Sequence, residues 1–245
     1  MKEFDFNIPN IFYWKRSDIP HSLPSQLITD CEKKAADDFK SQRRVHDYLW
    51  GRFLIRKIFA ASLQITIPSD FKKHSAGSFL PIADYYFSLS HNPIAIGLAI
   101  VKNGKIGLDI DSAKPGRKMD EIIANYGNAY EKIFFKTINE NEKEKYFYKL
   151  WTLKESFGKA TGLGLQENLK ELELDLKKNL VLKNSIVDSC QMFHVELENT
   201  FISLTCLNNL MIQPKLYRVG WRHDDFIIEK MIDIDFEHLP RITVF

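Results

Sequence analysis

The order of sequence patterns in the first half of the chain is repeated in the second half. Leu49-Trp50 opens a long helical pattern, and Leu150-Trp151 opens another in the second half. The segment Phe87–Pro93 then leads into an apolar run, as does Phe193–Asn199. Two matches in the same order favour a duplicated unit of helices followed by strands, with a cleft between the copies. We therefore expect an α+β fold with two similar halves.

Periodicity and turn residues place the remaining elements. Helices are expected over Ser25–Lys40, Ser41–Leu63 and Asn141–Thr161, with further helical segments up to Lys136. Strands are expected in residues 1–20 and over Tyr85–Leu89, Ile94–Val101, Ile106–Asp111, Leu172–Leu182 and His194–Leu207. Asn103-Gly104 predicts a hairpin turn. We divide the chain into an N-terminal subdomain (1–103), a C-terminal subdomain (104–213) and a tail (214–245).

Composition limits the class of protein. The chain has 245 residues, 44% of them hydrophobic, and a net charge of +2, so it can bury a core and lacks the overall basicity of a nucleic-acid binder. Cys31, Cys190 and Cys206 are far apart and predict neither a disulfide framework nor a zinc site. There is no signal-peptide pattern and no apolar run of the ~20 residues that a membrane span needs. We expect a cytoplasmic protein with no nucleic-acid or membrane partner.

The segment Ile106–Asp111 alternates apolar residues with glycine and acids. In a strand its apolar residues would face a core, whereas Gly107, Asp109 and Asp111 would share the opposite face. Two carboxylates beside a glycine that leaves room suit a hard cation with oxygen ligands. An ordinary half-exposed strand with its acids in solvent gives the same pattern, so the segment alone does not decide between the two.

Trp151, Glu155 and Lys159 lie four residues apart and share one stripe of the helix expected over Asn141–Thr161. Glu155 can supply a third carboxylate to a cation or act as a base, with Lys159 beside a phosphate. A Glu-Lys pair at this spacing also stabilises a helix by ~0.2–0.5 kcal/mol on its own. The pair in isolation therefore has a purely structural explanation as well.

Two further groups of side chains suit an anionic ligand. Ser90 and His91 lie at the end of an expected strand, where a hydroxyl and an imidazole can donate to a phosphate. Arg44 and Arg52 lie eight residues apart on the helix over Ser41–Leu63 and belong to a loose basic stripe that can hold phosphates bidentately. A solvated surface explains any single member of either group.

These segments occur in the order seen in the Sfp-type (surfactin synthetase-activating) 4′-phosphopantetheinyl transferases, and the chain resembles that family. The matching motifs are FSLSH at Phe87–His91, IGLDID at Ile106–Asp111 and WTLKESFGKATG at Trp151–Gly162. The last motif is long and specific, and together with the second it argues against chance agreement. The motifs lie between residues 44 and 165, so the flanks rest on length and order alone.

The resemblance implies two similar α/β subdomains related by a pseudo-twofold axis, with coenzyme A and Mg²⁺ (Mn²⁺ as an alternative) in the cleft between them. The matching positions are Asp109, Asp111 and Glu155 for the metal, Glu155, Lys159 and Asp109 for catalysis, and Arg44, Arg52, Ser90, His91 and Lys159 for coenzyme A. Each of these roles is carried over from the family by the position of the residue in its motif.

Two positions depart from the family pattern. Asp111 stands where Glu is common, and its shorter side chain changes the reach to a metal. Upstream, Gly77-Ser78-Phe79 replaces the usual Gly-Lys/Arg-Pro, so a basic nucleotide contact is missing there. Arg43 or Lys73 is expected to substitute for it.

The resemblance implies transfer of 4′-phosphopantetheine from coenzyme A to a serine of an apo acyl- or peptidyl-carrier protein, with release of adenosine 3′,5′-bisphosphate. Carrier proteins are acidic around that serine, so Lys114, Arg117 and Lys118 are expected to dock them. A solvated charge run would look the same in sequence. We expect a monomer, since one chain would supply both sides of the cleft.

Two other functions stay open at this point. A degenerate relative would bind coenzyme A without catalysis, and a different Mg²⁺-dependent phosphotransferase or nuclease could use the same three acids. The complete acid set and Lys159 argue against the first alternative. The sequence has no G-x-x-x-x-G-K-[ST] loop, which weakens a kinase-like version of the second.

Overall fold

The computed structural model describes residues 4–24, 28–67, 79–164, 170–184, 186–187, 189–207, 213–223 and 225–239. The strands are β1 (Asn10–Lys15), β2 (Tyr85–His91), β3 (Ala95–Lys102), β4 (Lys105–Ser112), β5 (Leu172–Asp175), β6 (Leu180–Asn184), β7 (Gln191–Leu197), β8 (Thr200–Leu207), β9 (Lys215–Arg222), β10 (Asp225–Ile232) and β11 (Glu237–Leu239). The helices are η1 (Arg16–Asp18), α1 (Asp30–Asp37), α2 (Gln42–Ile58), η3 (Phe59–Leu63), α3 (Met119–Tyr126), α4 (Ala129–Thr137) and α5 (Glu140–Thr161).

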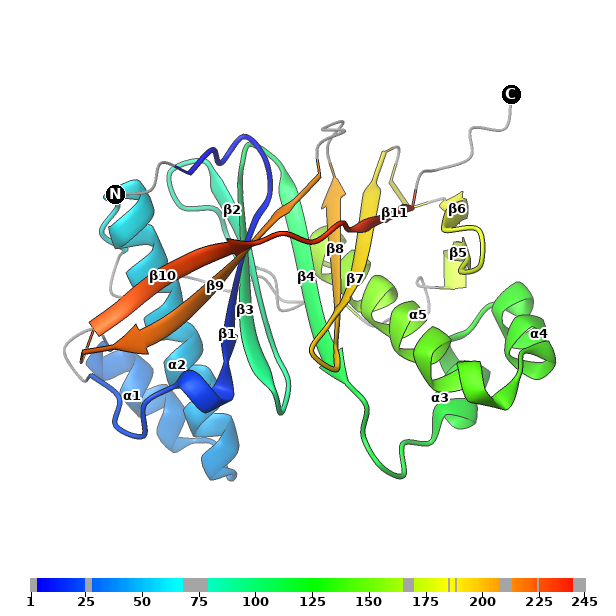
Figure 1. Cartoon of the computed structure of the whole chain (residues 1–245), viewed down its shortest axis with the longest axis horizontal. Coiled ribbons are helices and arrows are strands. Elements are labelled where there is room, and N and C mark those ends of the chain that lie inside the picture. The colour runs from blue at the N-terminus through cyan, green and yellow to red at the C-terminus, as the bar shows by residue number, and fades with distance from the viewer. Residues whose placement is uncertain are drawn as a thin grey trace.

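The first sheet has the strand order β10-β9-β1-β3-β2 (Figure 1). β1 is antiparallel to β3 and parallel to β9, so both ends of the sequence meet in this sheet. Trp14 of β1 meets Trp50 of α2 edge to face, with ring centroids 5.3 Å apart, and meets Phe226 of β10 at 5.4 Å. All three rings are buried, so α2 is fixed on the sheet mainly by aromatic packing.

The second sheet has the order β11-β7-β8-β4, and α5 packs against β4 and β8. α5 ends at Gly162, whose φ of 78° is the left-handed conformation that stops a helix. Gly107 of β4 lets the helix come close, because a Cβ there would lie 2.0 Å from the carbonyl oxygen of Ser156 on α5. The space that this glycine leaves is therefore filled by the helix.

The two sheets repeat one strand order. β1-β3-β2 in the first sheet places the first, third and second strand of a unit side by side, and β4-β8-β7 does the same in the second. A long helix precedes the hairpin in each unit, α2 before β2 and β3, and α5 before β7 and β8. This repetition confirms the predicted α+β fold with two similar halves. The division of the chain at residues 103 and 213 stays a prediction.

The two sheets are joined along β2 and β4 by serine side chains. The hydroxyl oxygens of Ser88 and Ser90 accept the backbone N–H groups of Leu108 (2.9 Å) and Ile110 (3.1 Å). Both contacts step along the strands in the same direction, so β2 and β4 run parallel here. We refer to these two contacts as the serine seam.

The hairpin predicted at Asn103-Gly104 is wrong. Asn103 does adopt the positive φ, 56°, that a tight turn requires. The strands that it connects, β3 and β4, nevertheless belong to different sheets. β3 already has β1 and β2 on its two sides and therefore has no free edge for β4, which pairs with β8 from Lys105 to Ser112 instead.

Three other boundaries differ from expectation. α1 starts later than predicted, because Thr29 caps it and forms a capping box with Glu32, while residues 25–27 lie outside the described part of the chain. The strand predicted over Leu172–Leu182 is the hairpin of β5 and β6, with Asn179 at a φ of 54° in its turn. The tail forms β9, β10 and β11, and the segment between the last two crosses in front of both sheets in Figure 1.

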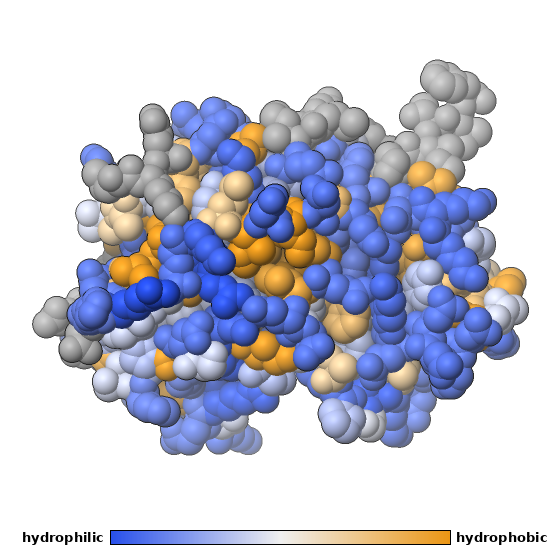
Figure 2. Space-filling model, in the orientation of Figure 1, coloured by the Kyte–Doolittle hydropathy of each residue, from blue (hydrophilic) through white to orange (hydrophobic). Residues whose placement is uncertain are grey.

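None of the helices among the described residues combines the length and the apolar character of a membrane span. The face in Figure 2 is largely hydrophilic, with apolar residues gathered near its centre. The cysteines are free, with Cys31 exposed and Cys190 and Cys206 buried.

Candidate active site

β4 carries both acids of the IGLDID segment on one face, as its alternation predicts. The apolar residues of the strand are buried in the core between the sheets. Asp109 and Asp111 alternate with them and share the face of Gly107, which α5 covers. They are only 7% and 5% exposed. Burial of two carboxylates on one strand is costly without cationic or hydrogen-bonding partners.

Two pairs of hydroxyls fix α5 against β8, the neighbour of β4. Thr152 Oγ1 lies 2.7 Å from Ser203 Oγ, and Ser156 Oγ lies 2.8 Å from Thr205 Oγ1. All four residues are buried, and the two pairs are one helical turn apart. The helix cannot slide or rotate without breaking buried hydrogen bonds. The pairs therefore set the position of the helix face that carries the predicted catalytic residues.

Lys159, Asp109 and Ser90 form one hydrogen-bonded cluster. Lys159 Nζ donates to Asp109 Oδ1 (2.8 Å), to Ser90 Oγ (3.0 Å) and to the backbone oxygen of Leu108 (2.9 Å). Ser90 Oγ donates to the same Asp109 oxygen at 2.9 Å. The structure thus brings together one residue from each of the three motifs, on β2, β4 and α5.

Glu155 is close to the acids of β4. Burial raises the pKa of Glu155 to about 7, and the negative charges of Asp109 and Asp111 act in the same direction. The positive charges of Lys159 and Arg117 oppose this rise in pKa. A carboxyl with such a pKa can gain or lose a proton near neutral pH, as a general acid or base must.

Asp111 is held by two basic side chains from the loop after β4. Lys114 Nζ lies 2.6 Å from its Oδ1, and Arg117 Nη1 lies 2.6 Å from its Oδ2. The Arg117 guanidinium also lies over the ring of Trp151, 5.0 Å from the centroid, and over two further rings of α5. The side chain of Arg117 is only 14% exposed, whereas that of Lys118 is 72% exposed. Arg117 therefore faces the acids and not the solvent.

The described residues contain no group of three or more His, Cys, Asp or Glu side chains arranged to hold a metal ion. The oxygens of Asp109 and Asp111 meet lysine and arginine side chains instead. The chemistry of the donor set still fits Mg²⁺, because carboxylate oxygens are the ligands that it prefers. The repulsion that raises the pKa of Glu155 is also of the kind that a divalent cation relieves.

Three of the residues expected to hold a nucleotide can be located in the structure: one lies in the cluster of Lys159, and two are accessible to solvent. Ser90 contacts Lys159, and the adjacent His91 has a side chain that is 44% exposed. Arg44 is exposed on α2. The expectations for Lys73 and Ser78 lie outside the described residues.

Arg52 lies inside the protein and takes part in the packing of α1 on α2. It is 7% exposed, with its guanidinium over the rings of Tyr48 (5.0 Å) and Phe79 (5.3 Å). Its Nε lies 3.9 Å from a carboxylate oxygen of Glu32, which also binds Arg56 at 2.8 Å. The helical spacing in the sequence indicated the basic stripe. It did not indicate that Glu32, a buried acid of α1, pairs with Arg52 and Arg56 of this stripe.

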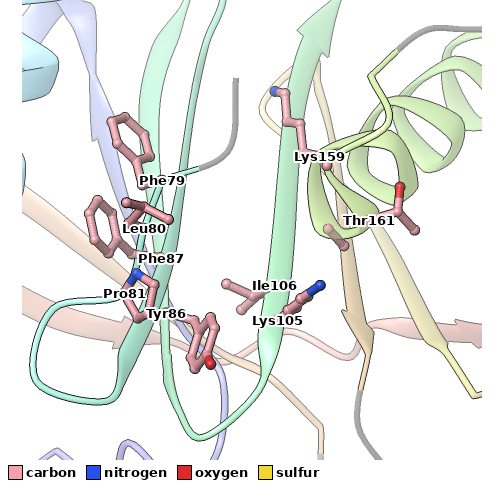
Figure 3. A pocket seen from close by; sticks show the side chains of 11 residues that line it. Phe79, Leu80, Pro81, Tyr86, Phe87, Lys105, Ile106, Lys159 and Thr161 are labelled. Atoms are coloured by element: carbon pink, nitrogen blue, oxygen red, sulfur yellow. The ribbon is translucent and has the colours of Figure 1, made fainter. Parts of the chain in front are cut away.

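A pocket of about 250 Å³ opens beside Lys159 (Figure 3). One wall consists of residues 79–81 and 86–87, and the opposite wall consists of residues 105–106 and 159–162. The lining is mainly apolar, with Lys105 and Lys159 as its cations. The sequence predicted a cleft between the two halves but not the residues that line this pocket, because its walls become neighbours only when β2, β4 and α5 are assembled.

The chain is similar to enzymes of one family. The model of the 4′-phosphopantetheinyl transferase superfamily matches residues 105–204. The L-aminoadipate-semialdehyde dehydrogenase-phosphopantetheinyl transferase of Mus musculus is 31% identical over 179 residues, which are 66% of this chain and 57% of that protein. The 4′-phosphopantetheinyl transferase HetI of Nostoc sp. is 22% identical over 214 residues, 81% of this chain and 89% of HetI.

A 4′-phosphopantetheinyl transferase of Bacillus subtilis is 29% identical over 142 residues, which are 57% of this chain and 62% of that protein. The chain thus spans little more than half the length of the mouse relative. The family model covers β4 and α5, the two elements that carry the most specific motifs and that the structure packs together. These matches support the predicted family: residues 105–204 of this chain are similar to the 4′-phosphopantetheinyl transferase superfamily.

Proposed function

We propose that the protein transfers 4′-phosphopantetheine from coenzyme A to a serine of an apo acyl- or peptidyl-carrier protein and releases adenosine 3′,5′-bisphosphate. The observation that carries the proposal is the cluster of Lys159, Asp109 and Ser90, with Glu155 on the same helix face as Lys159. Phosphoryl transfer to a hydroxyl needs a cation for the phosphate and a base for the proton. The relatives carry the same activity in their names.

Asp109, Asp111 and Glu155 would hold a Mg²⁺ ion in this reaction. Bound there, the ion supplies positive charge that reduces the repulsion between the diphosphate of coenzyme A and an incoming hydroxyl. The acids would have to exchange their present contacts with lysine and arginine side chains. Lys159, once released from Asp109, would be free to donate to a phosphate oxygen.

The proposed step forms one bond and breaks one bond at phosphorus. The serine oxygen bonds to the phosphorus that carries the pantetheine arm, and the bond from that phosphorus to the bisphosphate oxygen breaks. Glu155 would accept the proton of the serine hydroxyl, either directly or through a water that it orients. Lys159 stabilises the negative charge that develops on the leaving group.

Ser90, His91 and Arg44 are proposed contacts of the nucleotide phosphates, which lie away from the reacting phosphorus and so position the substrate. Ser90 already hydrogen-bonds to two residues of the cluster, and His91 follows it directly. Burial of Arg52 favours a supporting role for that residue, in which it holds α1 and Phe79 against α2.

Lys114, Arg117 and Lys118 are proposed to lie near the docked carrier protein, with Lys118 as its most direct contact because it is exposed. Charge reversal by Lys118→Glu should raise the KM for the carrier about tenfold or less and leave kcat within twofold. Lys230→Glu, an exposed lysine on β10, is the matched control. An unchanged carrier KM for Lys118→Glu would reject the docking role.

The transfer is tested by incubating the protein with coenzyme A, Mg²⁺ and an apo carrier protein, and then weighing the carrier. A mass gain of one phosphopantetheine arm supports the proposal. Tight binding of coenzyme A without a mass gain would identify a binding module, and cleavage of unrelated phosphoesters would identify another phosphotransferase. Asp109→Ala should abolish the mass gain while the protein stays folded by circular dichroism.

A cytoplasmic location is part of the proposal. The three free cysteines, of which Cys31 is exposed, suit a reducing compartment. We also propose a monomer, because the pocket beside Lys159 is lined by both sheets of one chain. Light scattering at the concentration used for the assay tests this state.

A further inference from the structure

A buried acid on α2 gathers basic side chains from several elements. Asp47 is 4% exposed. It forms an ion pair with Arg16 of η1, and its carboxylate oxygens lie 3.3 Å from His91 Nδ1, 3.7 Å from His46 Nδ1 and 3.9 Å from Arg43 Nε. We call these five residues the Asp47 hub. None of the sequence motifs contains Asp47 or Arg16, and no local pattern links them.

Arg16 also fixes the turn that carries His91. Its Nε donates to the backbone oxygen of Asn92 at 2.6 Å, and its backbone N–H donates to the oxygen of Ile94 at 2.8 Å. The Asn92 side chain in turn accepts the N–H groups of Ile94 and Ala95, each at 2.7 Å. The position of His91 therefore depends on the hub as well as on β2.

The hub keeps its acid and most of Arg16 inside, and presents its three other bases outward. The Asp47 side chain is 5% exposed, whereas the side chains of His91, His46 and Arg43 are 44%, 39% and 57% exposed. Two guanidinium groups face one carboxylate, so the hub keeps a net positive charge before either histidine is protonated. Outward-facing donors with surplus positive charge suit a phosphate monoester.

The hub is continuous with the catalytic cluster. Ser90, whose hydroxyl binds Asp109 and Lys159, directly precedes His91. Lys159 is also close enough to influence His91: burial chiefly lowers the pKa of that imidazole, Asp47 opposes the change, and Lys159 adds to it. One molecule can therefore contact the cluster with its reacting phosphate and the hub with a second phosphate.

We propose that Asp47 and Arg16 are positioning residues, and Arg43 a phosphate-binding residue, for the 3′-phosphate of the nucleotide in coenzyme A. The inference rests on the proposed function. The resemblance implied Ser90 and His91 as contacts of that phosphate, and Arg43 as a substitute base upstream. The geometry adds Asp47, itself held by Arg16, as the group that aligns His91 and Arg43 toward a shared ligand.

The test compares coenzyme A with dephospho-coenzyme A, which lacks only the 3′-phosphate. Asp47→Asn should raise the KM for coenzyme A about tenfold and leave kcat within about twofold, because an aligned charge-assisted contact is lost. The KM for dephospho-coenzyme A should not change. Asp225→Asn, an exposed acid on β10, is the matched control. An equal rise of both KM values, or no rise in either, would overturn the proposal.

A second measurement covers the case in which Asp47→Asn does not fold. Arg43 is 57% exposed, so Arg43→Gln should fold normally. Calorimetry of adenosine 3′,5′-bisphosphate and of adenosine 5′-monophosphate should show preference for the bisphosphate in the wild type and a smaller preference in this variant. Equal preferences would overturn the hub as a phosphate site. If the wild type prefers the bisphosphate but transfers nothing to a carrier, the proposed function fails and the hub stands.

Discussion

At the scale of single residues, Glu155 has the most unusual surroundings of the catalytic face. It lies on a helix whose register is fixed by buried hydroxyl pairs, and two acids of β4 act on it electrostatically. Burial and these two acids raise its pKa to about 7, so its carboxyl holds a proton more readily than an ordinary glutamate does. A negative charge is costly there unless a cation or a proton is nearby.

Replacement of Glu155 by glutamine should therefore remove activity without loss of the fold. We expect Glu155→Gln to lower kcat by at least about a hundredfold, because the amide cannot accept the serine proton. Removal of one of three mutually repelling carboxylates should leave the melting temperature unchanged or higher. Glu144→Gln, an exposed change on the same helix, should retain full activity. A Glu155→Gln protein with normal kcat would contradict the assigned role.

His194 is the second residue whose surroundings predict a measurable effect. Its Nδ1 lies 2.9 Å from Ser203 Oγ, and burial lowers the pKa of the imidazole to about 3. The folded protein therefore keeps His194 neutral, whereas the unfolded chain binds a proton below the ordinary histidine pKa of about 6.5. The stability from this residue is complete above that pH and is lost as the pH falls toward 3.

We expect the unfolding free energy to fall by up to about 1.4 kcal/mol for each pH unit below 6.5 from this residue alone. His194→Gln should flatten the pH dependence between pH 6.5 and 5, measured by urea unfolding at several pH values. His21→Gln, at an exposed position, should leave the slope as it is in the wild type. Parallel slopes for the wild type and His194→Gln would show that the imidazole does not titrate on unfolding.

At the scale of elements, the serine seam holds together the two strands that carry the cluster. Ser88 and Ser90 are both buried and both accept a backbone N–H of β4. Ser90 in addition binds Asp109 and Lys159, whereas Ser88 has no such contact among the described hydrogen bonds. The two serines therefore share a structural role, and only Ser90 has a place in the cluster.

Alanine substitutions should separate these roles. Ser88→Ala leaves a buried N–H without a partner and should cost about 1–3 kcal/mol of unfolding free energy, with kcat and KM unchanged. Ser90→Ala should cost a similar amount and should also reduce kcat/KM for coenzyme A, because Asp109 and Lys159 lose a shared contact. Stability is measured by urea unfolding and activity by the carrier mass assay. Equal kinetic losses in the two variants would show that the seam acts on the site only through the fold.

Helices and strands whose residues repeat at a regular spacing could be predicted from the sequence. Strands whose place depends on pairing with a distant part of the chain could not. The alternation in IGLDID and the spacing of Trp151, Glu155 and Lys159 describe β4 and α5 because each element keeps its apolar and its polar residues at regular spacing. The turn at Asn103 was recognised, but the choice of partner strand depends on which neighbours are already paired. The strands of the tail could not be inferred, since β9 is stabilised by parallel pairing with β1 at the other end of the chain.

The same distinction applies to the site. Asp109, Glu155 and Lys159 stand in segments whose motif spacing identifies them. The inward position of Arg117 depends on three rings of α5, which periodicity does not connect with the loop after β4. Asp47 and Arg16 come from different elements and meet only in the fold. The residues that flank such isolated polar residues in the sequence do not show which partners they have in the fold.

At the scale of the whole molecule, the C-terminal strands complete both sheets. β9 and β10 extend the first sheet beside β1, and β11 extends the second beside β7. Leu216, Val219 and Leu239 from these strands are almost completely buried. Lys149 of α5, whose side chain is only 4% exposed, binds Glu237 of β11. The tail therefore belongs to the folding unit of each half.

A chain that ends at residue 213 should fail to fold cooperatively. It would lose buried residues from the cores of both sheets and leave the edges of β1 and β7 unpaired. We expect aggregation during purification and no cooperative melting transition by circular dichroism. Glu237→Gln in the full chain is the control, since it removes only the ion pair with Lys149 and should still melt cooperatively. Cooperative melting of the shortened chain would assign the tail a function other than folding.

The serine seam also bears on how a nucleotide enters and leaves. A backbone ladder between β2 and β4 would merge the halves into one continuous sheet, and separating them would break many hydrogen bonds at once. The serine seam, the contacts of Ser90 with Asp109 and Lys159, and apolar packing require far less, so a hinge motion along this line would leave each sheet intact. If the proposed function holds, such a motion would alter the width of the pocket beside Lys159 and would let coenzyme A and its bisphosphate product exchange without unfolding of either half.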